Sequence, residues 1–315
     1  MSPAITLRHK ARNLLHSALL VGGMAAIVAA CAWTIWGGAG LVWAFAAVAL
    51  GLALVPALPA SLILSLYRAV PLKREALPAL HAVLDELSRR AGLDRPPALY
   101  YLPSATLNAF TVGRRNDAAI TVTDGLVRRL DLRDISAVLA HELSHVKNND
   151  LWLMTLADSM SRFTSLASYF GLLLVLVNLP LALAGAAAVS WLLVALLVFA
   201  PTIMSLFQLA LSRAREYDAD LDAARLTGDP EGLAAALQKL ERYQGRFWEE
   251  IVLPGRRIPE PSLLRTHPPT AERVRRLRAL APARPPRPEL ARLALPRTMP
   301  AITPPPRFRW PGLWY

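Results

Sequence analysis

Two long stretches of the chain, residues 13–67 and 163–212, contain no Asp, Glu, Lys or Arg. Each is long enough for two helices of the roughly 20 apolar residues that cross the hydrocarbon core of a bilayer. A Gly-Gly-Ala-Gly cluster at 37–40 interrupts the first stretch, and residues 178–180 and Gly185 interrupt the second. The pattern predicts four spans in two transmembrane helical hairpins, although the second hairpin could also enter the membrane without fully crossing it.

The polar parts of the chain have the periodicities of a mixed domain. Residues 78–92 repeat apolar positions at helical spacing, with Pro where a first turn tolerates it and Gly at the end. Residues 98–102 and 120–123 are short runs typical of strands. Residues 68–162 and 213–282 are therefore predicted to be the two parts of one α+β domain. The second hairpin, 163–212, separates them in a chain that is mainly α.

The remaining segments are an N-terminal hairpin, residues 1–67, and a tail, residues 283–315, that is rich in Pro and Arg. The composition of the tail cannot bury a core, so an extended or disordered conformation is expected. Cys31 follows a basic and then apolar segment that resembles a lipoprotein signal. The apolar run continues through it, which favours an uncleaved transmembrane helix, and a single cysteine excludes an intrachain disulfide.

The formal net charge is +12. Lys and Arg flank every predicted span on the same side, and both hairpin turns are uncharged. The positive-inside rule then predicts that both termini and the polar domain face the cytoplasm. We expect the membrane to be the inner membrane of a bacterial cell. This distribution and the basic tail account for the charge, so nucleic-acid binding is not indicated.

Residues 141–145 read His-Glu-Leu-Ser-His, and they follow a helix start at Asp131. Positions four apart lie on one face of a helix, so His141 and His145 can grip a single cation, with Glu142 beside them as a base. Two solvated histidines on an amphipathic helix are the alternative, but an HExxH motif is rare by chance. The pattern predicts a zinc hydrolase site.

A hydrolytic zinc site needs a third protein ligand and one position left for water. Glu216 is the best donor, and Asp220 lies four residues later, on the same helix face. Asp220 could accept the outer N–H of a ligand histidine and fix its tautomer. A charged helix surface is the alternative for this segment taken alone, but it is less satisfactory beside an HExxH motif.

Four segments together, residues 108–113, 141–150, 213–220 and 266–273, resemble the signature blocks of the HtpX-like membrane zinc metalloproteases. These are gluzincin-type enzymes related to the CAAX prenyl proteases. The resemblance covers about residues 60–280 and no metal-ligand position departs from it. It implies a membrane-embedded endopeptidase with a zincin-like domain. His141, His145 and Glu216 are implied to hold one Zn²⁺ per chain, and Glu142 to be the catalytic base.

The resemblance also implies that Asn108 and Ala109 line an edge strand that holds substrate in extended form. From the residues alone, this segment is only a turn leading out of a strand. His267 is a candidate to stabilise the oxyanion, although it could equally belong to a helix entrance before residues 271–280. Tyr217 is a weaker candidate for the same role.

The expected substrates are polypeptides. From Leu211 to Glu216 a helix rises by only about 8 Å, so the site should lie close to the bilayer and favour membrane-associated proteins. The resemblance implies degradation of misfolded ones in membrane protein quality control. A processing protease for lipidated C-termini is one alternative, and a non-catalytic zinc-binding scaffold or chaperone is another. The intact Glu142 argues against the scaffold. The sequence leaves the physiological substrate and the oligomeric state open.

Overall fold

The computed structural model describes residues 3–54, 60–113, 115–186, 189–250, 268–280, 308–309 and 313–314. The chain is mostly helical with a small sheet. It divides into two compact units. The apolar unit comprises Leu7–Ala57 and Trp152–Ala214, and the α+β unit comprises Met1–Thr6, Leu58–Leu151 and Arg215–Tyr315.

Among the described residues, three helices are long and apolar enough to cross a membrane: α1 (Pro3–Leu54), α6 (Asp150–Leu183) and α7 (Trp191–Thr227). Large apolar side chains such as Phe45 and Leu192 are exposed on them. A surface of this kind is unfavourable in water and suits lipid. Within the described residues the structure thus shows three membrane-capable helices, the first of which is interrupted.

Helix α1 is not regular throughout. Trp36 (φ −134°, ψ 15°) and Gly37 (φ 58°, ψ −140°) leave the helical region of backbone space. A positive φ is easily adopted by glycine, which has no Cβ to clash. The break coincides with the start of the glycine cluster in the first charge-free stretch, so α1 consists of two helical segments.

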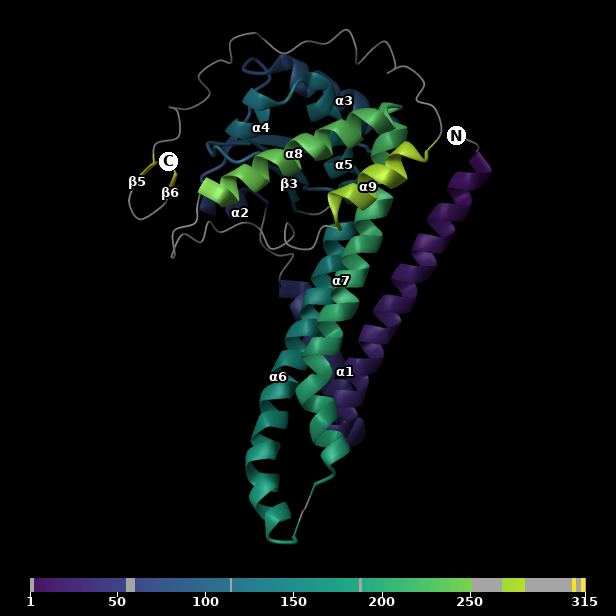
Figure 1. Ribbon diagram of the computed structural model, residues 1–315, viewed down its shortest axis with the longest axis vertical. Coiled ribbons are helices and arrows are strands. Elements are labelled where there is room, and N and C mark those ends of the chain that lie inside the picture. The colour runs from purple at the N-terminus through teal and green to yellow at the C-terminus, as the bar shows by residue number, and fades with distance from the viewer. Residues whose placement is uncertain are drawn as a thin grey trace. The chain divides into compact units, whose positions relative to one another are not determined.

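The connection between α6 and α7 lies at Gly185 (φ 77°) and not at residues 178–180, because Pro180 is inside α6. Asn178 is buried and bonds the backbone of Val189 twice, with its side-chain nitrogen donating to the carbonyl (2.9 Å) and its oxygen accepting from the N–H (3.1 Å). These bonds satisfy a polar side chain in the apolar C-terminal part of α6. They also hold the end of α6 to the start of α7, which run antiparallel within the apolar unit (Figure 1).

The α+β unit contains a four-stranded sheet in the order β1-β2-β4-β3. Its strands are β1 (Val70–Pro71), β2 (Ala98–Leu102), β3 (Ala109–Val112) and β4 (Ala119–Thr123). β2 and β4 pair in parallel, and the two outer pairs are antiparallel. The strands predicted at 98–102 and 120–123 are confirmed. The turn read from the residues alone at Asn108 and Ala109 is wrong for Ala109, because β3 begins there, at one end of the sheet, where the resemblance implies an edge strand.

Six helices of the described residues accompany this sheet. They are α2 (Ala60–Leu66), α3 (Pro78–Ala91), α4 (Asp124–Arg129), α5 (Leu132–Lys147), α8 (Pro230–Glu250) and α9 (Thr270–Arg278). α2, α4 and α5 contact its strands, α3 and α8 pack on α5, and α9 packs on α8. α5 packs against α3, α8 and β3 (Figure 1). It begins as expected, because the Asp131 side chain accepts the Asp134 N–H at 2.9 Å. Gly92, with φ 70°, ends α3 as predicted.

Only two short pieces of the tail are described, β5 (Phe308–Arg309) and β6 (Leu313–Trp314), which pair antiparallel. The rest of the extended or disordered tail that we predict lies outside the described residues, as does His267.

Candidate metal centre

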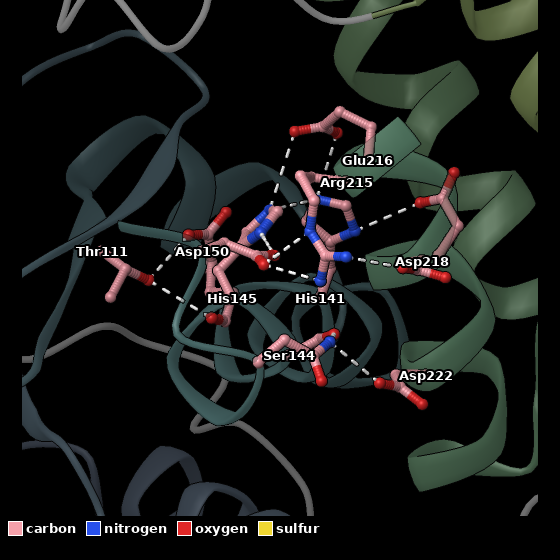
Figure 2. Close-up of polar contacts among 12 residues, drawn as sticks. Thr111, His141, Ser144, His145, Asp150, Arg215, Glu216, Asp218 and Asp222 are labelled. Atoms are coloured by element: carbon pink, nitrogen blue, oxygen red, sulfur yellow. Dashed lines mark hydrogen bonds and ion pairs between the residues drawn. The ribbon is translucent and has the colours of Figure 1, made fainter. Parts of the chain in front are cut away.

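Helix α5 brings His141 and His145 together because they lie one turn apart on the same face. Their Nε2 atoms are 3.3 Å apart, and their rings meet edge to face with centroids 4.9 Å apart. His141 is buried and His145 is half-buried. The two nitrogens therefore point at a common position, as Figure 2 shows.

Glu216, on α7, supplies a carboxylate at the same position. Its Oε2 lies 3.4 Å from Nε2 of His141, and its Oε1 lies 3.6 Å from Nε2 of His145. Ligand atoms of these three residues all lie within 4.8 Å of one another, and Glu216 is buried. Two nitrogens and one oxygen in such a cluster match the donor set of a hydrolytic zinc site.

The outer ring nitrogens are occupied by carboxylates. Nδ1 of His141 lies 3.1 Å from Oδ1 of Asp220, and Nδ1 of His145 lies 2.8 Å from Oδ2 of Asp150. A carboxylate can only accept, so Nδ1 carries the proton in both rings and, in the neutral ring, Nε2 presents a lone pair. Two lone pairs and a carboxylate facing one another repel unless a cation lies between them. The residues present therefore fit a metal ion.

Each of these carboxylates is in turn held by an arginine. Arg273 of α9 donates to both oxygens of Asp220, at 2.8 and 2.6 Å. Arg215 of α7 contacts Oδ1 of Asp150 with Nε at 2.7 Å and Nη2 at 2.6 Å. All four side chains are buried. The centre thus has two His–Asp–Arg chains, one behind each imidazole, and the charged hydrogen bonds keep the carboxylates in place.

The electrostatics of the cluster favour a positive charge. Burial lowers the pKa of His141, but its contacts with Asp220 and Glu216 outweigh burial and raise the pKa to about 10. Burial likewise opposes protonation of His145, yet the hydrogen bond to Asp150 raises its pKa. The surrounding carboxylates thus stabilise a positive charge at the imidazoles, and a divalent metal ion would supply that charge.

Glu142 does not belong to the ligand group. Its Oε2 accepts a 2.8 Å hydrogen bond from the hydroxyl of Thr111, on β3. Strand β3 begins at Ala109, which is buried, and Asn108 just before it is tied to β4 through the hydroxyl and backbone of Thr123. The structure thus places the edge strand beside the helix that carries the HExxH motif.

Two predicted positions remain, Tyr217 and His267. Tyr217 has the guanidinium of Arg276 over its ring, with the guanidinium carbon 3.6 Å from the centroid. His267 is outside the described residues.

Sequence reasoning missed Asp150, Arg215, Arg273 and Thr111. A local signal for Asp150 exists, because it follows His145 by five residues after Asn149, whose φ of 57° turns the chain back. Asparagine adopts this left-handed conformation more readily than most residues. The other three come from elements that approach α5 only in the folded chain, so no spacing identifies them. Their sequence signal is that they lie inside the segments 108–113, 213–220 and 266–273 that resemble the family.

Comparisons with known proteins agree with this geometry. Residues 75–281 match the model of peptidase family M48. A protein named "Protease HtpX homolog" from Acidiphilium cryptum is 37% identical over 287 residues, covering 85% of this chain and 97% of that one. Another of that name from Kineococcus radiotolerans is 38% identical over 244 residues, covering 70% and 80%.

Among solved structures, S. mikatae Ste24p overlaps 86% of this chain and 66% of its own, with a TM-score of 0.46 and 19% identity. The family match and the curated relatives suffice: this chain belongs to peptidase family M48 and is an HtpX-like membrane metalloprotease.

Proposed function

We propose that the chain is a zinc-dependent endopeptidase whose one Zn²⁺ is held by His141, His145 and Glu216. The convergence of the two Nε2 atoms on one position, with both Nδ1 atoms held by carboxylates, carries this proposal. Zinc, when bound, polarises a peptide carbonyl and lowers the pKa of a water toward about 7.

Glu142 is proposed as the proton carrier of the reaction. It lies next to His141 on α5 but turns its carboxylate to Thr111 rather than into the ligand group. It takes the proton of the attacking water and passes it to the leaving amine, acting as general base and then as general acid. His267 remains the proposed partner of the developing oxyanion.

Strand β3 is the proposed substrate-binding edge. It is the terminal strand of the four-stranded sheet and contacts α5, which bears the proposed base. An extended peptide added beside Asn108 and Ala109 would be held by backbone hydrogen bonds, largely independent of its side chains. This mode suits an enzyme that cuts many misfolded or membrane-associated proteins.

We further propose two transmembrane hairpins, residues 1–67 and 163–212, with the catalytic domain formed by 68–162 and 213–282 on the cytoplasmic side of an inner membrane. The break at Gly37 supports a turn within α1, and the flanking cations support the orientation. A reporter fused at Gly38 should be extracytoplasmic and one after Arg74 cytoplasmic. The opposite pattern would invert the topology.

The Glu142→Gln variant tests the mechanism. We expect it to keep its metal but lose proteolysis of an unfolded substrate in detergent, because the base is not a ligand. His141→Ala, His145→Ala and Glu216→Ala should lose both. Metal analysis of the purified variants beside a cleavage assay measures both properties. Full proteolytic activity of Glu142→Gln would contradict the proposal.

A further inference from the structure

Thr111 is a polar residue in a position where an apolar one would be expected. Side chains alternate along a strand, so Thr111 shares a face of β3 with Ala109, which belongs to the core formed with α5. Phe110 points the other way and packs with Ala60 and Leu64. Thr111 is only 4% exposed. A buried hydroxyl costs free energy unless it finds a hydrogen-bond partner.

The partner of this hydroxyl is Glu142. Oγ1 of Thr111 lies 2.8 Å from Oε2 of Glu142 and 3.4 Å from its backbone carbonyl oxygen. One hydroxyl has one proton, so the shorter contact takes it. Figure 2 shows Thr111 directed at the helix that carries His141 and His145. A hydrogen bond to an ionised carboxylate is among the stronger ones in proteins.

We propose that Thr111 is a positioning residue for Glu142. By holding Oε2, the hydroxyl keeps the carboxylate in one orientation and leaves Oε1 to receive the proton of the attacking water. Because Thr111 belongs to β3, the strand that is proposed to bind substrate also orients the base. This inference rests on the proposed function, since it assigns Thr111 a role only if Glu142 is the base.

The Thr111→Val variant removes the hydroxyl and keeps the shape. We expect kcat to fall about tenfold, the scale of a lost hydrogen bond to a charged group, with KM changed by less than about twofold. Metal affinity, measured by competition with a chelating indicator, should stay at the wild-type value. Thr111→Ser should restore most of kcat. The rescue separates positioning of the base from packing of the strand.

Thr121→Val is the matched control. Thr121 lies on the neighbouring strand β4, is fully buried, and its hydroxyl makes no hydrogen bond with any described residue. This variant should keep wild-type kcat. If kcat of Thr121→Val falls as far as kcat of Thr111→Val, the cause is a disturbed sheet rather than the lost bond to Glu142, and the inference is overturned. Should Thr111→Val fail to fold, Thr111→Ser and Thr111→Ala, which differ only in the hydroxyl, provide the same comparison.

A double-mutant cycle tests the link to Glu142 directly. Aspartate at 142 is one methylene shorter and draws the carboxylate away from Thr111, so Thr111→Val should cost nothing more in a Glu142→Asp background. Wild-type kcat for Thr111→Val beside an inactive Glu142→Gln would overturn this inference alone. An active Glu142→Gln would instead overturn the proposed function.

Discussion

The two sides of the metal centre use the same chemistry with different connections. On both, an imidazole Nδ1 meets an aspartate that an arginine holds. On the His145 side, Asp150 is a near neighbour in sequence, reached through the turn at Asn149. On the His141 side, Asp220 comes from another helix, α7, and Arg273, 132 residues after the histidine, comes from α9.

The arginines differ in their second partners. Arg215 also donates to Asp218 at 2.8 Å, a carboxylate outside the ligand group. Arg273 lies 3.3 Å from Oε2 of Glu216, which is a proposed ligand. The guanidinium of Arg273 and a metal ion would therefore compete for the carboxylate of Glu216. Arg273 is thus shared between Asp220 and Glu216, and we expect Asp220 to have two tasks: to orient His141, and to keep Arg273 from turning wholly to Glu216.

The largest effect should come from neutralising the aspartates. We expect Asp220→Asn and Asp150→Asn each to weaken metal affinity by about 10- to 100-fold, as supporting residues of metal sites do. Asp220→Asn should lie at the upper end, because it releases Arg273 toward Glu216. Competition titration of the purified variants ranks them. Equal losses of metal affinity in the two variants would mean that Arg273 does not compete with the metal for Glu216. Wild-type affinity of Asp220→Asn would show that Asp220 does not support His141.

A smaller effect is expected from lysine at the arginine positions. Lysine keeps the charge but cannot donate to two carboxylate oxygens as a planar fork. Arg273→Lys and Arg215→Lys should each weaken metal affinity by about fivefold, less than the worth of a charged hydrogen bond, because the arginines act on the metal only through the aspartates. Arg133→Lys, in an Asp–Arg pair with no histidine, should leave the affinity unchanged. A tenfold loss in that control would mean that the titration reports general stability rather than the metal centre.

The smallest effect concerns Asp229, which Arg133 holds in the same bidentate way, at 2.5 and 2.8 Å. Burial raises the pKa of Asp229, but bonds from Arg133 and the Gly232 N–H outweigh it and lower the pKa. Its stabilisation is therefore present above the unfolded aspartate pKa, about 4, and lost as pH falls through the lower folded value.

We expect Asp229→Ala to lower the free energy of unfolding by about 1 kcal/mol at neutral pH, since it removes the cap of α8. Thermal unfolding in detergent, repeated toward acid, should show the difference from wild type shrinking. Metal affinity should not change. A constant difference at all pH values would mean that the carboxylate charge plays no part.

Helix-local features were open to prediction because they depend on few residues. The four-residue spacing of His141 and His145 determines a shared helix face whatever surrounds it. The Asp131 cap and the Gly92 end follow from backbone groups within one turn. The location of the α6–α7 connection was less accessible, since proline is tolerated in a long apolar helix and Pro180 does not end α6.

By itself, then, the sequence determined the membrane-capable helices and the pair of metal-binding histidines on one helix face, because charge-free length and helical spacing are local properties. Only the tertiary structure decided which side chains support them. Thr111 meets Glu142 because β3 packs against α5, and Arg273 meets Asp220 because α9 returns to α7. Such contacts depend on packing between segments far apart in the chain, which no spacing along it records.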